Sequence, residues 1–257
     1  MTAILETVNL RREFGALVAV DDVSVAIEEG SLHSIIGPNG AGKTTFFNLV
    51  SGTLAPTSGR VFYQGDDITD LPVHRTIHRG IGRSFQITNI FPNLTVFENV
   101  RLAAQAMGRG NYQLFRSHLR LTEPAARAAE VLEQVGLTGR AQAPARTLPH
   151  GDQRKLELGM ILAPDPRVLM LDEPTAGMAA EQVPELMQLV QEIQSAGDKT
   201  VVLVEHNMNV VMSVSDRITV MHQGSLLAEG TPADISADER VQTAYLGDLY
   251  REAGGTS

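Results

Sequence analysis

The sequence of 257 residues contains no cysteine, and only three of its residues are lysines. The absence of cysteine excludes disulfide bonds, thiol nucleophiles and cysteine-ligated metal sites, and it fits a reducing cytoplasm. No apolar run approaches the about 18 residues that a membrane span requires. The N-terminus also lacks the basic segment of a signal peptide. We therefore expect membrane contact only through partner proteins.

Positive charge is also scarce. The chain has 21 basic and 30 acidic residues, for a formal net charge of −9. Phosphate contacts along a nucleic acid require a basic face, so this balance argues against a nucleic-acid partner. The length allows one large domain or two small ones, and the 43% hydrophobic content can supply a core.

One segment has the spacing G-x-x-x-x-G-K-[ST] of a phosphate-binding loop, which we call the phosphate loop. An apolar run at residues 32–36 predicts a buried strand before it, and residues 44–50 predict a helix after it. The glycines let backbone N–H groups face phosphates, and the helix N-terminus adds positive potential. This predicts binding of a nucleoside triphosphate with Mg²⁺, in which Lys43 reaches the β- and γ-phosphates and the Thr44 hydroxyl ligates the metal. The loop consists of Gly37, Pro38, Asn39, Gly40, Ala41, Gly42, Lys43, Thr44 and Thr45.

An apolar strand predicted at residues 168–171 ends in two carboxylates, Asp172 and Glu173. In phosphate-loop enzymes the first acidic residue after such a strand helps to hold Mg²⁺, which assigns Asp172. Glu173 is then placed to polarise the attacking water as a general base. A strand ending in Asp-Glu is weak evidence by itself, and it gains its meaning from the phosphate loop.

The remaining pattern alternates between strands and helices, which predicts an α/β fold around buried strands. Residues 108–122 form a weakly patterned connector, interpreted as a solvated loop or short surface helix, with contact to a membrane partner as the alternative. Strands are expected at residues 18–27, 61–63, 81–86 and 200–204, helices at 125–135, 182–195 and 207–215, and a hairpin at 217–221 and 226–229.

Two polar residues follow predicted strands. His206 comes after the strand at 200–204, and ligands gather at the carboxyl ends of parallel strands. A lone histidine is more often structural, and an isolated glutamine such as Gln86, at the end of the strand at 81–86, would ordinarily lie on the surface. Both gain significance only from the order of all the motifs together.

That order resembles the order of motifs in the ATP-binding cassette (ABC) ATPases. Along this chain the motifs are the phosphate loop, Gln86, the stretch 148–153, Asp172-Glu173 and His206. The resemblance runs from about residue 5 to residue 246. It implies one nucleotide-binding domain over residues 1–257. Its expected parts are a phosphate-loop core with a mostly parallel sheet, an antiparallel β subdomain, and a helical subdomain at about residues 87–160.

The resemblance also implies residue roles. Phe14 matches the aromatic that stacks on adenine, although without the pattern it would be taken for a core residue. Gln86 matches the glutamine that links Mg²⁺ and water to the transmembrane partner, and His206 matches the switch histidine. The family's signature segment, whose helix N-terminus faces the γ-phosphate held by the other subunit, is matched by Leu148, Pro149, His150, Gly151, Asp152 and Gln153.

Two positions depart from the family pattern. Pro149 stands where the signature segment usually has serine, and proline offers neither a hydroxyl nor an N–H to a phosphate. It is either tolerated at the helix start, where proline fits sterically, or it weakens the ATP site formed with the partner. Ala179 stands where the family often has an aspartate. We hypothesise that the chain forms two unequal sites with a different ATPase subunit.

A narrower resemblance is to the ATPase subunits of branched-chain amino-acid importers and their urea and amide relatives, carried by residues 84–96, 176–178, 228–232 and 244–247. It implies ATP hydrolysis coupled to transmembrane permeases, a second ATPase subunit that is identical or different, and indirect work with a solute-binding protein. The expected location is the inner face of the plasma membrane. The main alternative is an exporter subunit; a soluble regulatory ABC ATPase and a phosphate-loop kinase are lesser ones.

Overall fold

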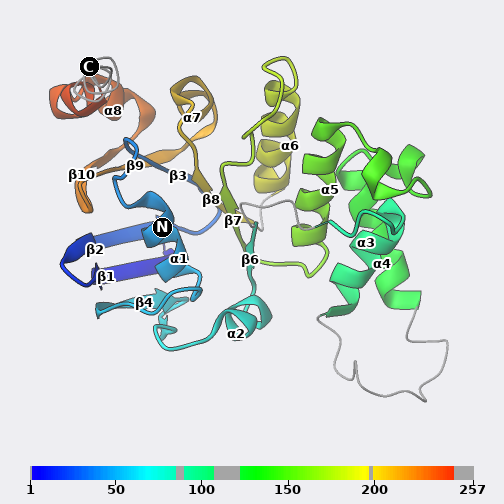
Figure 1. Cartoon of the computed structure of the whole chain (residues 1–257), viewed down its shortest axis with the longest axis horizontal. Coiled ribbons are helices and arrows are strands. Elements are labelled where there is room, and N and C mark those ends of the chain that lie inside the picture. The colour runs from blue at the N-terminus through cyan, green and yellow to red at the C-terminus, as the bar shows by residue number, and fades with distance from the viewer. Residues whose placement is uncertain (1, 85–89, 107–121, 197–198, 246–257) are drawn as a thin grey trace.

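The computed structural model describes residues 2–84, 90–106, 122–196 and 199–245. Within them lie a six-stranded sheet and a four-stranded sheet, which meet around α1 (Lys43–Val50), together with a group of helices (Figure 1). The α/β fold expected from the sequence is confirmed.

The six-stranded sheet has the order β10-β9-β3-β8-β7-β6. All neighbouring strands in it are parallel except β9 and β10, which form an antiparallel hairpin. Its strands are β3 (Leu32–Ile36), β6 (Ile81–Arg83), β7 (Val168–Asp172), β8 (Thr200–Val204), β9 (Arg217–His222) and β10 (Ser225–Gly230). The phosphate loop and the Asp-Glu pair therefore both follow central strands of one sheet.

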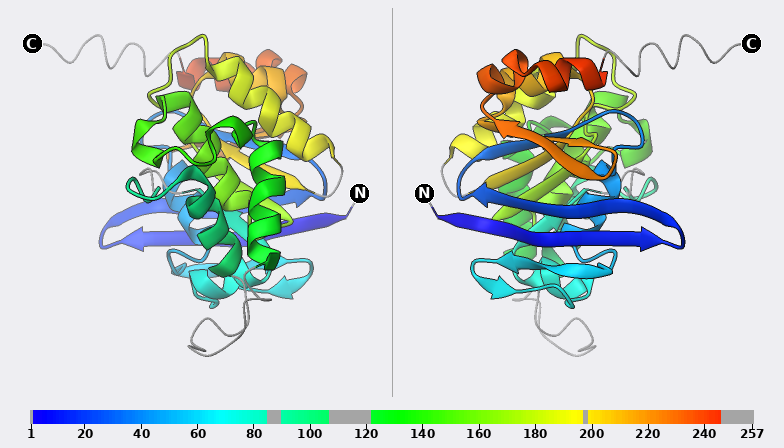
Figure 2. Two further views of the ribbon diagram at one scale, coloured as in Figure 1. Left: turned by 90° about the vertical axis from the view of Figure 1, so that its right-hand side faces the viewer. Right: turned by 90° about the vertical axis from the view of Figure 1, so that its left-hand side faces the viewer.

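The four-stranded sheet is antiparallel and has the order β2-β1-β4-β5. It consists of β1 (Ala3–Phe14), β2 (Leu17–Glu28), β4 (Ser58–Tyr63) and β5 (Asp66–Asp67). Figure 2 shows the long β1–β2 hairpin on the side opposite to the helices α3, α4 and α5.

The helices after α1 are distributed around the parallel sheet: α3, α4, α5 and α6 lie on the side away from the antiparallel sheet, α2 lies beside β6, and α8 lies beside β10 (Figure 1). They are α2 (Val73–His78), α3 (Val96–Ala106), α4 (Thr122–Gln134), α5 (His150–Leu162), α6 (Val183–Ser195), α7 (Met208–Val214) and α8 (Pro232–Ala237), with 3₁₀ turns at Thr138–Arg140 and Ala145–Thr147. In the part of the chain that the structure describes, no helix is long and apolar enough to cross a bilayer.

Strand β7 shows how the core is divided. Leu169 and Leu171 pack into the cluster formed with the helices, whereas Val168 and Met170 pack into the cluster that contains α1 and the antiparallel sheet. Successive side chains of a strand point to opposite faces, so a strand that is apolar at every position is buried on both. The carboxyl end of β7 consequently emerges between the two halves of the core.

Most expected elements lie within two residues of the observed ones. The expected C-cap Gly136 after α4 has the left-handed φ of 71° typical of that position. Strand β6 is described only as far as Arg83, so Gln86 lies outside the described residues, as does nearly all of the connector at 108–122. The single-domain organisation and the helical subdomain bounds stay predictions.

Candidate functional site

The phosphate loop is held between the two sheets. The Gly42 backbone lies so close to β2 that a Cβ atom there would stand 2.3 Å from the Ala19 carbonyl oxygen. A Cβ on Gly37 would stand 2.2 Å from the Met221 carbonyl oxygen of β9. The Gly224 N–H, in the β9–β10 turn, donates to the Ala41 carbonyl at 3.0 Å. Only glycine fits at the two close approaches, and this fixes the curve of the loop.

The start of α1 is open to a phosphate. Gly42 is the N-cap, no side chain caps the helix, and no acidic residue lies in the first turn. The free N–H groups and the helix dipole therefore form an anion site. Lys43 is buried, and its Nζ donates to the carbonyls of Gly37 at 2.6 Å and Pro38 at 3.0 Å, whereas Thr44 is exposed. Burial lowers the pKa of Lys43, and the charges of Glu173 and Asp172 oppose that effect.

Asp172 ends β7 as a buried carboxylate. Its backbone N–H donates to the Ser84 hydroxyl at 2.8 Å, and its Oδ2 has no hydrogen-bond partner among the described residues. Arg83 lies 3.8 Å from that oxygen. Burial raises the pKa of Asp172 against the opposing charge of Arg83, and burial also lowers the pKa of Arg83. A buried carboxylate oxygen without a partner is what a cation ligand is expected to look like before the cation binds.

Glu173 has the left-handed φ of 47°, which is unusual for a residue with a side chain. Its N–H donates to the Val204 carbonyl at 2.8 Å, so the end of β8 holds the backbone. The Nδ1 atom of His206 lies 3.8 Å from Glu173 Oε1, and the His206 side chain is 60% exposed. The structure thus brings the proposed base and the proposed switch histidine together at the carboxyl ends of β7 and β8.

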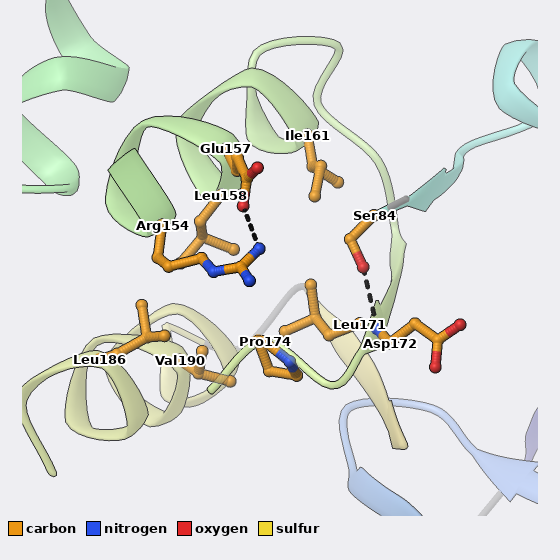
Figure 3. A pocket seen from close by; sticks show the side chains of 10 residues that line it. All are labelled: Ser84, Arg154, Glu157, Leu158, Ile161, Leu171, Asp172, Pro174, Leu186 and Val190. Carbon is orange, nitrogen blue, oxygen red and sulfur yellow. Dashed lines mark hydrogen bonds and ion pairs between the residues drawn. The ribbon is translucent and has the colours of Figure 1, made fainter. Parts of the chain in front are cut away.

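A small pocket separates β7 from helices α5 and α6 (Figure 3). The figure shows the Asp172 carboxylate pointing away from this pocket. Arg154 of α5 projects into it and donates to Glu157 at 2.8 Å and to the Ala176 carbonyl at 2.9 Å. Helix α5, which begins within the signature segment, is therefore bonded to the turn that follows Glu173.

Phe14 lies at the end of β1 and is 46% exposed. The Arg12 guanidinium carbon lies 4.7 Å from the centre of its ring. Phe14 pairs with Leu17, two residues before the Ala19 carbonyl that contacts the phosphate loop. An exposed ring on the hairpin that supports the phosphate loop is compatible with base stacking and excludes the core role considered above.

The signature segment is separated from the phosphate loop of the same chain. Its helix α5 packs in the helical core cluster and α1 packs in the other, and Figure 1 shows the two helices apart. Pro149 is the N-cap of α5, with no side-chain capping bond, and His150 is exposed. Asp152 forms an ion pair with Arg140 at 3.0 Å, and the side-chain amide of Gln153 donates to the Leu148 carbonyl at 2.9 Å. Gly151 is buried, and a Cβ on it would lie 3.2 Å from the Gln182 side chain.

The sequence interpretation did not include three residues that support the site. They are Arg83 beside Asp172, and the pair formed by Thr175 and the fully buried Glu205. A carboxylate directly after an apolar strand was the signal that identified Asp172, and the same signal at residues 200–204 would have identified Glu205. The contacts of Arg83 with Asp172 and α1 depend on tertiary structure and cannot be predicted from the local sequence.

Two family models match the chain. The model described as ABC transporter matches residues 20–176, and the model described as branched-chain amino acid ATP-binding cassette transporter matches residues 225–250.

Several curated proteins are similar over nearly the whole chain. The high-affinity branched-chain amino acid transport ATP-binding protein BraF of Pseudomonas aeruginosa is 42% identical, covering 95% of this chain and 98% of BraF. The corresponding protein LivG of Escherichia coli K12 is 38% identical, with the same two coverages. The lipopolysaccharide export system ATP-binding protein LptB of E. coli K12 is 32% identical, covering 97% of this chain and 99% of LptB.

Solved structures agree with this similarity. The ADP conformation of MJ1267, an ATP-binding cassette of an ABC transporter, superposes with a TM-score of 0.84 at 30% identity, covering 96% of this chain and all of that one. A dimeric post-hydrolysis state of the cassette MJ0796, bound to ADP and Pi, has a TM-score of 0.75 at 29% identity, covering 89% and 98%.

Proposed function

Because the chain belongs to the ABC transporter family of ATPases, we propose that it is the ATP-hydrolysing subunit of an importer for branched-chain amino acids or related small solutes. The observation that carries the proposal is the meeting of Asp172, Glu173 and His206 at one edge of the sheet that also bears the phosphate loop. The direction of transport rests on the similarity to BraF and LivG and on the second family match.

The base, the phosphate loop and the Mg²⁺ ligands of each site are assigned to one chain. The phosphate loop and the start of α1 receive the phosphates, Lys43 neutralises the β- and γ-phosphates, and Phe14 stacks on the base. Thr44, Asp172 and Gln86 would hold Mg²⁺, and Asp172 Oδ2, which accepts no hydrogen bond, and the exposed Thr44 fit that role. Bound Mg²⁺ would neutralise charge on the phosphates during the reaction.

The chemical step is hydrolysis of the γ-phosphoanhydride bond. Glu173 accepts a proton from a water molecule, whose oxygen attacks the γ-phosphorus while the bond to ADP breaks. His206 lies 3.8 Å from the Glu173 carboxylate, and its proposed role is to contact the γ-phosphate when ATP is bound. The partly exposed Glu173 carboxylate is reachable by water, in contrast to Asp172, which is buried.

A second ATPase subunit, identical or different, completes each site. ABC cassettes form dimers, as in the similar post-hydrolysis structure, and the exposed N-terminal end of α5 would face the ATP held by the partner. Pro149 lacks the hydroxyl and the N–H usual at its position, and Ala179 lacks a carboxylate. The two sites of the assembly are therefore proposed to be unequal, with a different ATPase as the partner.

The proposal for the membrane side is coupling to permeases through residues 87–100. Only part of that segment is described, and it includes Phe91, which is 50% exposed. Membrane contact would then occur through the permeases at the inner face of the plasma membrane, with a solute-binding protein acting indirectly. The similarity to LptB keeps an exporter as the second candidate.

The test is purification of the tagged chain from detergent-solubilised membranes, followed by identification of its partners and reconstitution into liposomes. Recovery of two permeases and a different ATPase, with ATP-dependent uptake of leucine, isoleucine or valine, would support the proposal. Glu173→Gln is the matched inactive control. Recovery of an export-type membrane protein alone would favour the exporter, and outward transport would contradict import.

A further inference from the structure

Glu205 is a carboxylate with no exposed surface at the end of β8, between Val204 and His206. Its Oε1 accepts two hydrogen bonds from one residue, the Thr175 N–H at 3.1 Å and the Thr175 hydroxyl at 2.6 Å. Its Oε2 is buried with no partner among the described residues. Burying a carboxylate with one oxygen unsatisfied is costly, so the contact with Thr175 must offset much of that cost.

Thr175 belongs to the turn that carries Glu173. In this turn the Ala176 N–H donates to the Glu173 carbonyl at 3.0 Å, and the Met178 N–H donates to the Thr175 carbonyl at 3.1 Å. Glu173 itself has a positive φ of 47°. A non-glycine residue persists in that conformation only when its surroundings hold it there.

Three consecutive residues of one chain segment hold this turn at three points. The Val204 carbonyl accepts from the Glu173 N–H at 2.8 Å, the Glu205 carboxylate accepts from Thr175, and His206 lies 3.8 Å from the Glu173 carboxylate. Val204 fixes the backbone before Pro174, and Glu205 fixes it after Pro174. The direction of the Glu173 side chain is therefore set from both sides.

We propose that Glu205 is a positioning residue for ATP hydrolysis: through Thr175 it holds the strained Glu173 in the orientation in which its carboxylate meets the attacking water. The inference rests on the proposed role of Glu173 as the base. Glu205 itself has no exposed surface, so it acts on the base through Thr175. Because a shift of about 1 Å in a catalytic group costs up to roughly 100-fold in rate, a contact of this kind acts on turnover and leaves nucleotide affinity unchanged.

The test compares four single variants and one double variant, Glu205→Leu with Thr175→Val, in the purified transporter assembly, with kcat and KM for ATP measured by phosphate release. Glu205→Leu removes both acceptor bonds, and Thr175→Val removes only the hydroxyl bond. Glu205→Gln keeps an acceptor oxygen at the same place, and Thr175→Ser keeps the donor. Glu173→Gln serves as the inactive reference, and the exposed Glu192→Gln of α6 serves as the surface control.

We expect Glu205→Leu to lower kcat roughly 10- to 100-fold with KM for ATP unchanged within about twofold. Thr175→Val lowers kcat less, and both conservative variants restore most of it. The double variant falls no further than Glu205→Leu, because both changes remove one interaction. A normal kcat in Glu205→Leu together with an inactive Glu173→Gln would overturn the positioning role of Glu205 and leave the proposed function of the chain standing.

Two further outcomes are decisive. A joint loss of nucleotide binding and turnover in Glu205→Leu, with normal turnover in Thr175→Val, would assign Glu205 to general stability and overturn the positioning role. Normal turnover in Glu173→Gln would overturn the assigned base itself, and this inference with it.

Discussion

The phosphate loop of one subunit and the signature segment of the other are assigned to the same triphosphate, yet this chain builds the two segments differently. The loop is anchored to β2 on one side and to the β9–β10 hairpin on the other, with Lys43 buried and bonded to the loop carbonyls. The signature segment contains the N-terminus of α5, where the exposed Pro149 occupies the N-cap. Its Asp152 and Gln153 are engaged within the chain.

We interpret the difference in terms of the proposed site: the phosphate loop is formed in advance within a single chain, whereas the signature segment is expected to act only against a partner. A loop that must surround a phosphate is best formed in advance, because ordering it on binding would cost affinity. A face that must close on a partner is left exposed. The following experiments test this contrast, beginning with the largest effect.

Replacing the proposed base Glu173 should trap a dimer in which the phosphate loop of one subunit and the signature segment of the other hold the same ATP. Glu173→Gln is expected to lower ATP hydrolysis about 10²- to 10⁴-fold, the contribution typical of a general base, without weakening ATP binding. ATP that is not hydrolysed should hold the phosphate loop of one subunit against α5 of the other. Phosphate release and light scattering with ATP measure both effects. Normal turnover, or a monomer at saturating ATP, would count against the arrangement.

Replacing Lys43 should weaken ATP binding by the phosphate loop. Lys43→Ala is expected to weaken ATP binding about 100-fold, because hydrogen bonds to charged groups contribute up to about 3 kcal/mol. Titration with a fluorescent ATP analogue measures the effect. Arg79→Ala, which removes an exposed cation paired with Asp66, is the control for net charge. Unchanged affinity in Lys43→Ala would contradict its assigned role.

Restoring serine should strengthen the partner-dependent half. Pro149→Ser adds a hydroxyl and an N–H at the N-cap of α5, and we expect the ATPase rate of the assembled transporter to rise about tenfold. Serine also caps helices, so Pro149→Asp separates the two effects: it caps α5 but repels a phosphate. An equal rise in both variants would assign the gain to helix stability, and no rise would remove the hypothesis of a weakened site.

Truncating the aromatic should have the smallest effect. Phe14→Ala is expected to weaken ATP binding about fivefold, the low end for base stacking, since the ring is half exposed. Phe14→Tyr keeps a ring and should bind normally. Comparing ATP with inorganic triphosphate isolates the base, because triphosphate affinity should be the same in all three proteins. A weaker triphosphate affinity in Phe14→Ala would place its effect on the phosphate loop.

Much of the fold could be predicted because its signals are local. The glycines and Lys43 have a fixed spacing, and β3, β7 and β8 are short, mostly apolar runs that are buried at every position. The signature helix could be placed, but the internal partners of Asp152 and Gln153 could not, since Arg140 lies in a separate 3₁₀ turn. Gln86 lies outside the described residues, and its role stays a prediction.

By itself the sequence determined the phosphate loop, the acidic pair and many of the strands and helices, because each depends on spacing along the chain, whereas β1, α2 and α8 were not expected. Only the tertiary structure decided that Glu205 is buried against Thr175, that Arg83 accompanies Asp172, and that Glu173 has a positive φ. These contacts join residues as far apart as 89 positions, as in Arg83 and Asp172, and are set by how β6, β7 and β8 align in the sheet. Their physical cause is the packing of parallel strands, which brings distant carboxyl ends to one edge.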